Sequence, residues 1–181
     1  MMGRFLFVFI CTLQMASMSA QVMVAKNILI RFFSSTPIED IEAKSNQGGS
    51  AINLQTRKVY TKVAIKSFKF KSGLMEEHFN ENYLESDKYP HAEFDGIIQG
   101  EIDLNKESES LIKVSGKLTM HGMSKDIEVP VSIQSKNGKL MVKSVFKVKP
   151  QDYKIDIPKL VTKSIAEEIE VSTTAEFESK K

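Results

Sequence analysis

Apolar and polar side chains alternate along a stretch that begins at Val59. Val59 and Val63 share one face with a threonine between them, while the intervening positions are mostly polar. A period of two is typical of a β-strand with one buried face. After Ser67 the parity reverses, since the apolar positions become Phe68 and Phe70. A β-bulge reverses side-chain direction in this way, so we predict a long, bent strand with a bulge near Ser67.

The same alternation recurs in five later segments, each of which keeps one face apolar. These segments are 92–104, 111–120, 127–133, 140–148 and 169–177. Three of the connections between them, 105–110, 121–126 and 134–139, have the length of hairpin links, and Asn137-Gly138 is a favoured tight-turn pair. Short links between successive strands predict an antiparallel meander.

Two shorter apolar segments, 28–33 and 41–45, predict strands upstream, with Gly48-Gly49 as a turn after them. The predicted fold is therefore all-β, a roughly eight-stranded antiparallel barrel whose interior holds side chains or one slim ligand. Pro130 lies on the outward face of its strand and removes one ladder donor. We expect it at an edge, a bulge or a barrel seam.

Two segments show helical spacing. Met75, Phe79 and Tyr83 recur every four residues within 73–84 and form one apolar row on a helix. A weaker pattern covers 159–168, after a proline. We therefore predict one short helix packed beside or over the barrel, and a second, less regular one near the C-terminus.

The first twenty residues differ from the rest of the chain. Arg4 precedes an apolar run, and small residues follow before Gln21, which is the pattern of a secretory signal peptide. The run is shorter than the ~20 residues that span a bilayer. We expect cleavage near Ser19 or Ala20, a single domain over residues 21–181, and a periplasmic or secreted location.

Composition narrows the function further. The 181 residues carry 25 Lys and Arg against 23 Asp and Glu, and the two signs are interspersed, so no basic stripe for nucleic acid is expected. The single cysteine, Cys11, lies in the predicted signal peptide. The expected mature chain therefore has no disulfide and no thiol chemistry, and packing alone must stabilise it.

The search for catalytic or metal chemistry is mostly negative. The sequence contains neither a Gly-rich phosphate loop nor a Gly-x-Ser-x-Gly motif. His78, His91 and His121 are widely spaced, whereas catalytic zinc sites usually show a close pair, so we predict no metal and no cofactor. An enzyme that uses His78 with Glu77 or Glu81 is the least favoured hypothesis.

Two motifs together resemble the YceI-like family of exported bacterial proteins. The first is the run 75–90, which ends in Tyr89-Pro90 and precedes Phe94. The second is the run 116–125, a Gly-x-Leu-Thr strand that leads into the turn at His121-Gly122. The resemblance covers roughly residues 59–177. It implies a lipocalin-like barrel whose tunnel holds a long isoprenoid chain, such as a polyprenyl lipid or a quinone tail.

The resemblance and the strand parity together predict which side chains line that tunnel, with the helical residues acting as a lid. The predicted tunnel residues are Val63, Ile65, Phe68, Phe70, Met75, Phe79, Tyr83, Phe94, Val114, Leu118 and Met120.

Three hypotheses follow. The leading one is an exported carrier or storage protein for a polyisoprenoid or other long-chain lipid, which contacts a membrane only transiently for lipid exchange and can form a homodimer. The second is a solid barrel that serves as a structural or interaction module without a ligand. The third is the enzyme on an isoprenoid substrate. An open interior favours the carrier, and a filled interior with an exposed apolar patch favours the module.

Overall fold

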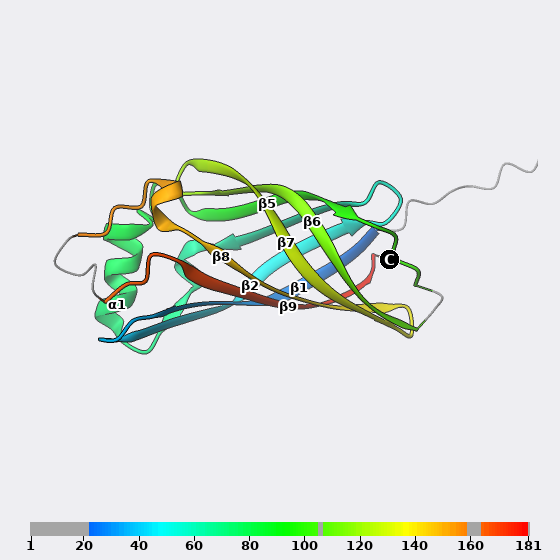
Figure 1. The fold of residues 1–181 in the computed structure, drawn as a ribbon, viewed down its shortest axis with the longest axis horizontal. Coiled ribbons are helices and arrows are strands. Elements are labelled where there is room, and N and C mark those ends of the chain that lie inside the picture. Colours follow the sequence, from blue (N-terminus) through cyan, green and yellow to red (C-terminus); the bar gives the residue numbers. More distant parts are fainter. Residues whose placement is uncertain (1–21, 105–106, 159–163, 181) are drawn as a thin grey trace, which may run out of the picture.

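The computed structural model describes residues 22–104, 107–158 and 164–180. It is an elongated antiparallel barrel with a helix at one end (Figure 1). The strands are β1 Val22–Ser35, β2 Asp40–Asn53, β3 Lys58–Ala64, β4 Lys69–Phe70, β5 His91–Gln99, β6 Ser108–Met120, β7 Met123–Lys136, β8 Lys139–Val148 and β9 Ile169–Ser179. The helical elements are η1 Ile65–Ser67, α1 Gly73–His78, η2 Phe79–Tyr83 and η3 Pro150–Tyr153.

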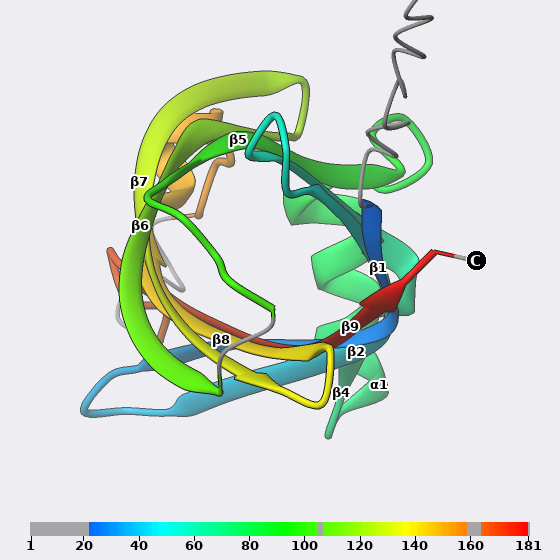
Figure 2. The ribbon, with the colours of Figure 1, turned by 90° about the vertical axis from the view of Figure 1, so that its right-hand side faces the viewer.

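Eight of these strands close the barrel. Their order is β1-β9-β8-β7-β6-β5-β3-β2, and β2 pairs back onto β1, while the two-residue β4 extends β2 outside the ring. Every pairing is antiparallel. The predicted eight-stranded antiparallel barrel is therefore confirmed, and the end-on view shows the closed ring (Figure 2).

The predicted bulge near Ser67 is wrong. The chain leaves β3 through the single 3-10 turn η1 and then forms β4. The hydroxyl of Ser67 donates to the backbone oxygen of Ala64 at 2.6 Å and lies 2.6 Å from the hydroxyl of Ser45. These hydrogen bonds stabilise a turn instead of a strand pairing. The turn accounts for the reversal of side-chain direction after Ser67.

The first two strands are longer than predicted, and Gly48-Gly49 is not a turn. Both glycines lie within β2, where Gly48 is opposite Ile28. The register of β1 shifts there, and Asn27 has a φ of 57°. A Cβ atom at Gly48 would lie 3.2 Å from Cδ1 of Ile30, so the small residue relieves crowding beside this irregularity.

The tight turns lie where the sequence placed the hairpins. Asn137-Gly138 connects β7 to β8, and both residues have positive φ, 51° and 73°. The link between β6 and β7 is shorter than the predicted 121–126, since only His121 and Gly122 separate the strands. Both of these residues also have positive φ, as a two-residue turn of type I′ requires.

Two further predictions are corrected by the element boundaries. β5 ends at Gln99 instead of residue 104, because Gly100 has a φ of 127° and the segment that follows crosses the end of the barrel (Figure 2). Residues 164–168 form turns and bends, so the predicted C-terminal helix is wrong there, and residues 159–163 lie outside the described part. The predicted signal peptide lies outside it as well. Among the described helices, none is long and apolar enough to cross a membrane.

Pro130 marks a seam in the barrel, as predicted. β7 pairs with β6 from Met123 to Ser135, but with β8 only over Val131–Lys136. The ladder with β8 thus begins directly after Pro130, the residue that lacks an N–H donor. The part of β7 that has no β8 partner is contacted by η3.

Candidate functional site

An elongated cavity of about 560 Å³ occupies the barrel interior. Five alternate residues of β9, from Ile169 to Phe177, line it. At about 3.3 Å per residue, these positions follow ~26 Å of strand. The lining is mostly aliphatic and aromatic, which is typical of a site for a small apolar molecule. Inward-facing Phe94, Leu118 and Phe146 are only half-buried, because they border this space.

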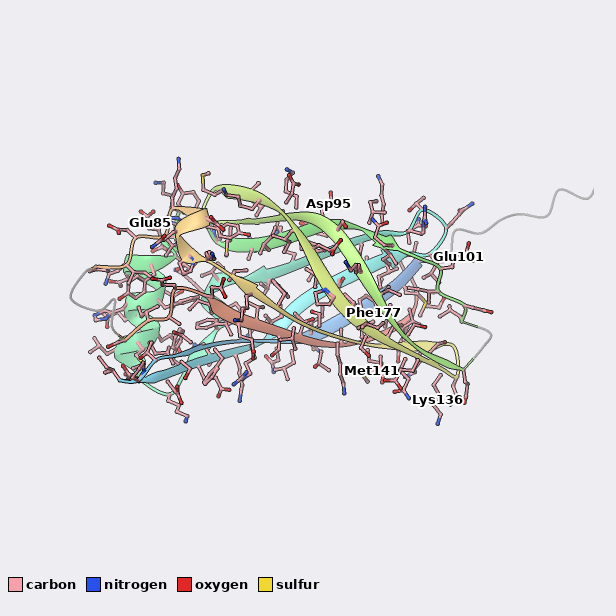
Figure 3. The ribbon with its side chains drawn as sticks, in the orientation of Figure 1. Glu85, Asp95, Glu101, Lys136, Met141 and Phe177 are labelled. Carbon is pink, nitrogen blue, oxygen red and sulfur yellow. The ribbon has the colours of Figure 1, made fainter. Side chains whose placement is uncertain are left out.

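The two ends of the cavity differ. At the end away from helix α1, Met23 and Leu140 are completely buried, and Ile102 and Leu104 pack against the core from the crossing segment. Figure 3 shows Phe177 toward this end and Glu85 beside the helix. At the helix end, Leu74 lines the cavity yet is 61% exposed, so the cavity reaches the surface there.

The helical lid is formed by α1 and η2. The backbone N–H of Met75 donates to the side chain of Ser72, which caps the helix at 3.4 Å. The helix continues as a π-helical turn from Phe79 to Tyr83, so the helix predicted over 73–84 is present. Met75, Phe79 and Tyr83 all line the cavity, so the predicted apolar row faces the barrel.

An aromatic cluster holds the lid to the barrel. The ring of Phe79 stacks on Phe32 of β1 with 5.3 Å between ring centroids, and lies 5.0 Å from Phe70 and 6.0 Å from Phe68. Phe32 also contacts Phe68 and Phe70, each at 5.5 Å. Because all four rings line the cavity, the cluster both fastens the lid and forms part of the apolar wall.

One carboxylate on α1 strengthens the same contact from outside the barrel. Glu76 pairs with Lys69 of β4, and its other oxygen accepts from the backbone N–H of Phe70 at 3.3 Å. The bond from Lys69 lowers the pKa of Glu76 below its ordinary value. The acidic stretch around the helix is therefore partly engaged in ion pairs that hold the lid.

A histidine joins the loop after the lid to the β6–β7 turn and to η3. Nε2 of His121 lies 2.8 Å from a carboxylate oxygen of Glu85, and Nδ1 lies 2.9 Å from the backbone oxygen of Tyr153. A carbonyl oxygen only accepts, so Nδ1 donates, and the contact to Glu85 then needs a second proton between the two groups. His121 therefore holds three segments together.

The two motifs that carried the family resemblance meet at this histidine. The ring of Tyr89 lies edge-on to the imidazole of His121, with 4.8 Å between centroids. Tyr89 also covers Gly122, where a Cβ atom would come within 2.7 Å of its ring. The first motif thus packs directly on the second, and both position the lid relative to the barrel mouth.

All eleven residues predicted for the tunnel line the cavity: Val63, Ile65, Phe68, Phe70, Met75, Phe79, Tyr83, Phe94, Val114, Leu118 and Met120. Their contact with a ligand stays a prediction. The predicted list omits further lining residues on β8 and β9, whose apolar faces the parity had indicated, and in the segment after η3, such as Ile155 and Ile165. It also omits five hydroxyl residues at inward positions of the strands: Ser34, Ser50, Thr61, Ser144 and Thr173.

The histidines do not form a metal site in the described part of the chain. Among those residues, no three His, Cys, Asp or Glu side chains lie close enough together to hold a metal ion. His78 lies at the cavity mouth, and His121 is engaged with Glu85 and Tyr153. Within the same residues, no hydrogen bond joins His78 to Glu77 or Glu81.

Solved structures with the same fold come from several bacteria. A polyisoprenoid binding domain from Saccharophagus degradans is 17% identical, with a TM-score of 0.74 over 89% of this chain and 99% of that one. BcnA from Burkholderia cenocepacia is 16% identical, with a TM-score of 0.67 over 82% and 95%. The Campylobacter jejuni YceI protein is 19% identical, with a TM-score of 0.65 over 81% and 89%.

Two comparisons start from the sequence, one with curated proteins and one with models of protein families. A search of curated proteins finds no relative. The profile of the YceI-like domain matches residues 17–177, nearly the whole chain, and includes both motifs. This protein therefore belongs to the YceI-like domain family.

Proposed function

We propose that this protein binds one long apolar chain, a polyisoprenoid or a similar lipid such as a quinone tail, inside the barrel and carries or stores it. The observation that supports this most is the continuous apolar cavity of about 560 Å³ from the lid to Phe177. Its volume is within the range of small-molecule sites. The Saccharophagus domain with the same fold is a polyisoprenoid binding domain, which agrees with this proposal.

The energetics suit a carrier. Burial of one methylene from water contributes about 0.8 kcal/mol, so ten buried methylenes contribute roughly 8 kcal/mol before the cost of ordering the chain. The same chain gains little on moving from a bilayer into the barrel, since both surroundings are apolar. We therefore expect strong retention in water and ready exchange with a membrane.

The barrel mouth has the side chains that such exchange needs. Leu74 of the lid is 61% exposed, and Ile38 of the β1–β2 turn is 63% exposed beside Glu39, which lines the cavity. We propose that this end contacts the membrane transiently, after export directed by the N-terminal segment. The open interior argues against the solid interaction module.

The proposal concerns binding and not catalysis. YceI-like domains are a family of binding proteins, and one relative with this fold is a polyisoprenoid binding domain. His78 and its neighbouring carboxylates form no bonded pair among the described residues, and most of the lining is aliphatic or aromatic.

A cavity-filling variant tests the proposal. Ala175 of β9 lines the cavity, whereas Thr174 beside it points to the other face of the strand. We expect Ala175→Phe to lower the amount of labelled polyprenol taken up from phosphatidylcholine vesicles, and Thr174→Phe to leave it unchanged. Equal uptake by both variants and the wild type would contradict binding inside the barrel.

A further inference from the structure

Two pairs of hydroxyl groups interrupt the apolar lining of the cavity. Ser50 of β2 lies 2.8 Å from Thr61 of β3, and Ser144 of β8 lies 2.8 Å from Thr173 of β9. All four residues line the cavity. β1 separates the two pairs on one side of the ring, and β5, β6 and β7 separate them on the other, so they face the interior from different walls.

In the first pair both hydroxyl hydrogens are already used within the protein. Ser50 donates to the backbone oxygen of Tyr60 at 2.9 Å, which uses its only hydrogen. Thr61 must then donate the hydrogen that joins it to Ser50. Neither hydroxyl has a hydrogen left for a ligand, so this pair offers acceptors only.

In the second pair, one of the two hydroxyl hydrogens is not used in a hydrogen bond between the two residues. Ser144 and Thr173 share a single hydrogen bond, which uses one of their two hydroxyl hydrogens. Among the described residues, no other group accepts from either hydroxyl. Ser144 is 8% exposed, and a buried hydroxyl hydrogen without an acceptor is unfavourable. The spare donor therefore faces the cavity, where an oxygen atom of a bound molecule can accept from it.

We infer that the bound lipid carries an oxygen acceptor, such as a ketone, ester or ether oxygen, which accepts a hydrogen bond from the Ser144–Thr173 pair. This inference rests on the proposed function and narrows its ligand from any apolar chain to an oxygenated one. The two hydroxyls thereby fix the position of the chain along the barrel as well as its chemical class.

The position of the pair places this oxygen within the cavity instead of at its mouth. Thr173 lies midway between Ile169 and Phe177, the first and last lining residues of β9. At ~3.3 Å per residue, about 13 Å of apolar strand extends on either side of it. The ligand accordingly has apolar groups on both sides of the oxygen.

A matched pair of probes tests the inference. The protein is incubated with phosphatidylcholine vesicles that contain equal amounts of octadecane and 9-octadecanone, which has a carbonyl at the centre of the same chain. The protein is then separated from the vesicles, and both compounds are quantified by mass spectrometry. The comparison of variants with the wild type cancels the unequal partitioning of the two probes into the vesicles.

The double variant Ser144→Ala with Thr173→Val removes the pair, and Ser50→Ala with Thr61→Val is its matched control. We expect the ketone-to-alkane ratio to fall about 5-fold in the first variant, as the loss of one neutral hydrogen bond implies, and to stay at the wild-type value in the control. An equal ratio in the wild type and the first variant would overturn the inference while the carrier function stands.

A second measurement needs no variant. The carbonyl stretch of isotope-labelled 9-octadecanone bound to the wild-type protein should lie at lower wavenumber than in octadecane solution, since a hydrogen-bonded carbonyl vibrates more slowly. An unshifted band would overturn the inference. Retention of neither probe by the wild type would instead overturn the carrier function, and this inference with it.

Discussion

The ring of Phe94 on β5 lies against Gly116 on β6, so closely that a Cβ atom at Gly116 would come within 2.9 Å of its Cζ atom. Gly116 pairs with Gly96, and a Cβ atom there would lie 2.7 Å from the same ring. The paired glycines let the ring of Phe94 lie flat on the barrel wall, which keeps the cavity open beside it.

This contact predicts the effect of Gly96→Ala. The new methyl group must displace the ring of Phe94 toward the cavity, so we expect less bound lipid and a loss of roughly 1–3 kcal/mol in the free energy of unfolding. The loss should become smaller when Phe94 is also changed to Ala, because the crowded ring is then absent. Chemical unfolding of the four proteins measures this coupling, and additive effects would show that Phe94 is not what Gly96 accommodates.

Phe79 is expected to fasten the lid. Phe79→Ala removes its contacts with Phe32, Phe68 and Phe70, and because Phe79 is half-buried we expect a loss of about 2 kcal/mol, below the ~3–5 kcal/mol of a fully buried ring. Hydrogen exchange of the lid should become faster. Leu74→Ala on the same helix is the control, and its effect should stay within about 0.5 kcal/mol. A lid that exchanges at the wild-type rate without Phe79 would refute this role.

The contact between Glu85 and His121 is expected to stabilise the loop after the lid. Glu85→Ala should cost about 1 kcal/mol, since the carboxylate is partly exposed. Glu85→Gln keeps a group that can bond to the imidazole and should cost less. Hydrogen exchange at η3 and at the β6–β7 turn reports the effect. Protection at the wild-type level in both variants would show that this bond does not hold the segments together.

The burial of Tyr153 predicts that the folded protein loses stability at alkaline pH. Its side chain is buried, and burial raises its pKa from 10 to about 12. Between pH 10 and 12 the unfolded chain loses this proton while the folded protein keeps it, so the folded state loses up to about 2 kcal/mol as the pH rises. Tyr153→Phe lacks this contribution. The difference in unfolding free energy between the two proteins should therefore change from pH 8 to pH 11 in favour of the variant, and a constant difference would contradict the burial.

The period of two in the sequence was sufficient to predict most of the barrel wall. In β3, β5 and β6 each strand has one apolar face, so parity alone assigned Val63, Phe94 and Leu118 to the interior, where the structure places them. The helix was predictable for the same reason, because Met75, Phe79 and Tyr83 repeat at the helical period.

Other features depend on contacts between distant residues and could not be read from a local pattern. Gly48-Gly49 has the composition of a turn, yet the partner strand β1 is irregular there and needs small residues opposite. His121 is 36 residues from Glu85 and 32 from Tyr153, and only the fold brings the three together. The inward hydroxyls Ser144 and Thr173 were within reach of the parity argument, but a search for apolar positions passes over them.

The most direct test of the central claim is to determine what occupies the barrel of the untreated protein. The protein is purified from cells with membranes and without detergent, extracted with organic solvent for mass spectrometry, and crystallised in parallel. We expect about one long-chain oxygenated lipid per barrel and continuous density from Ile169 to Phe177. An extract without lipid, together with a barrel interior filled by side chains, would contradict it.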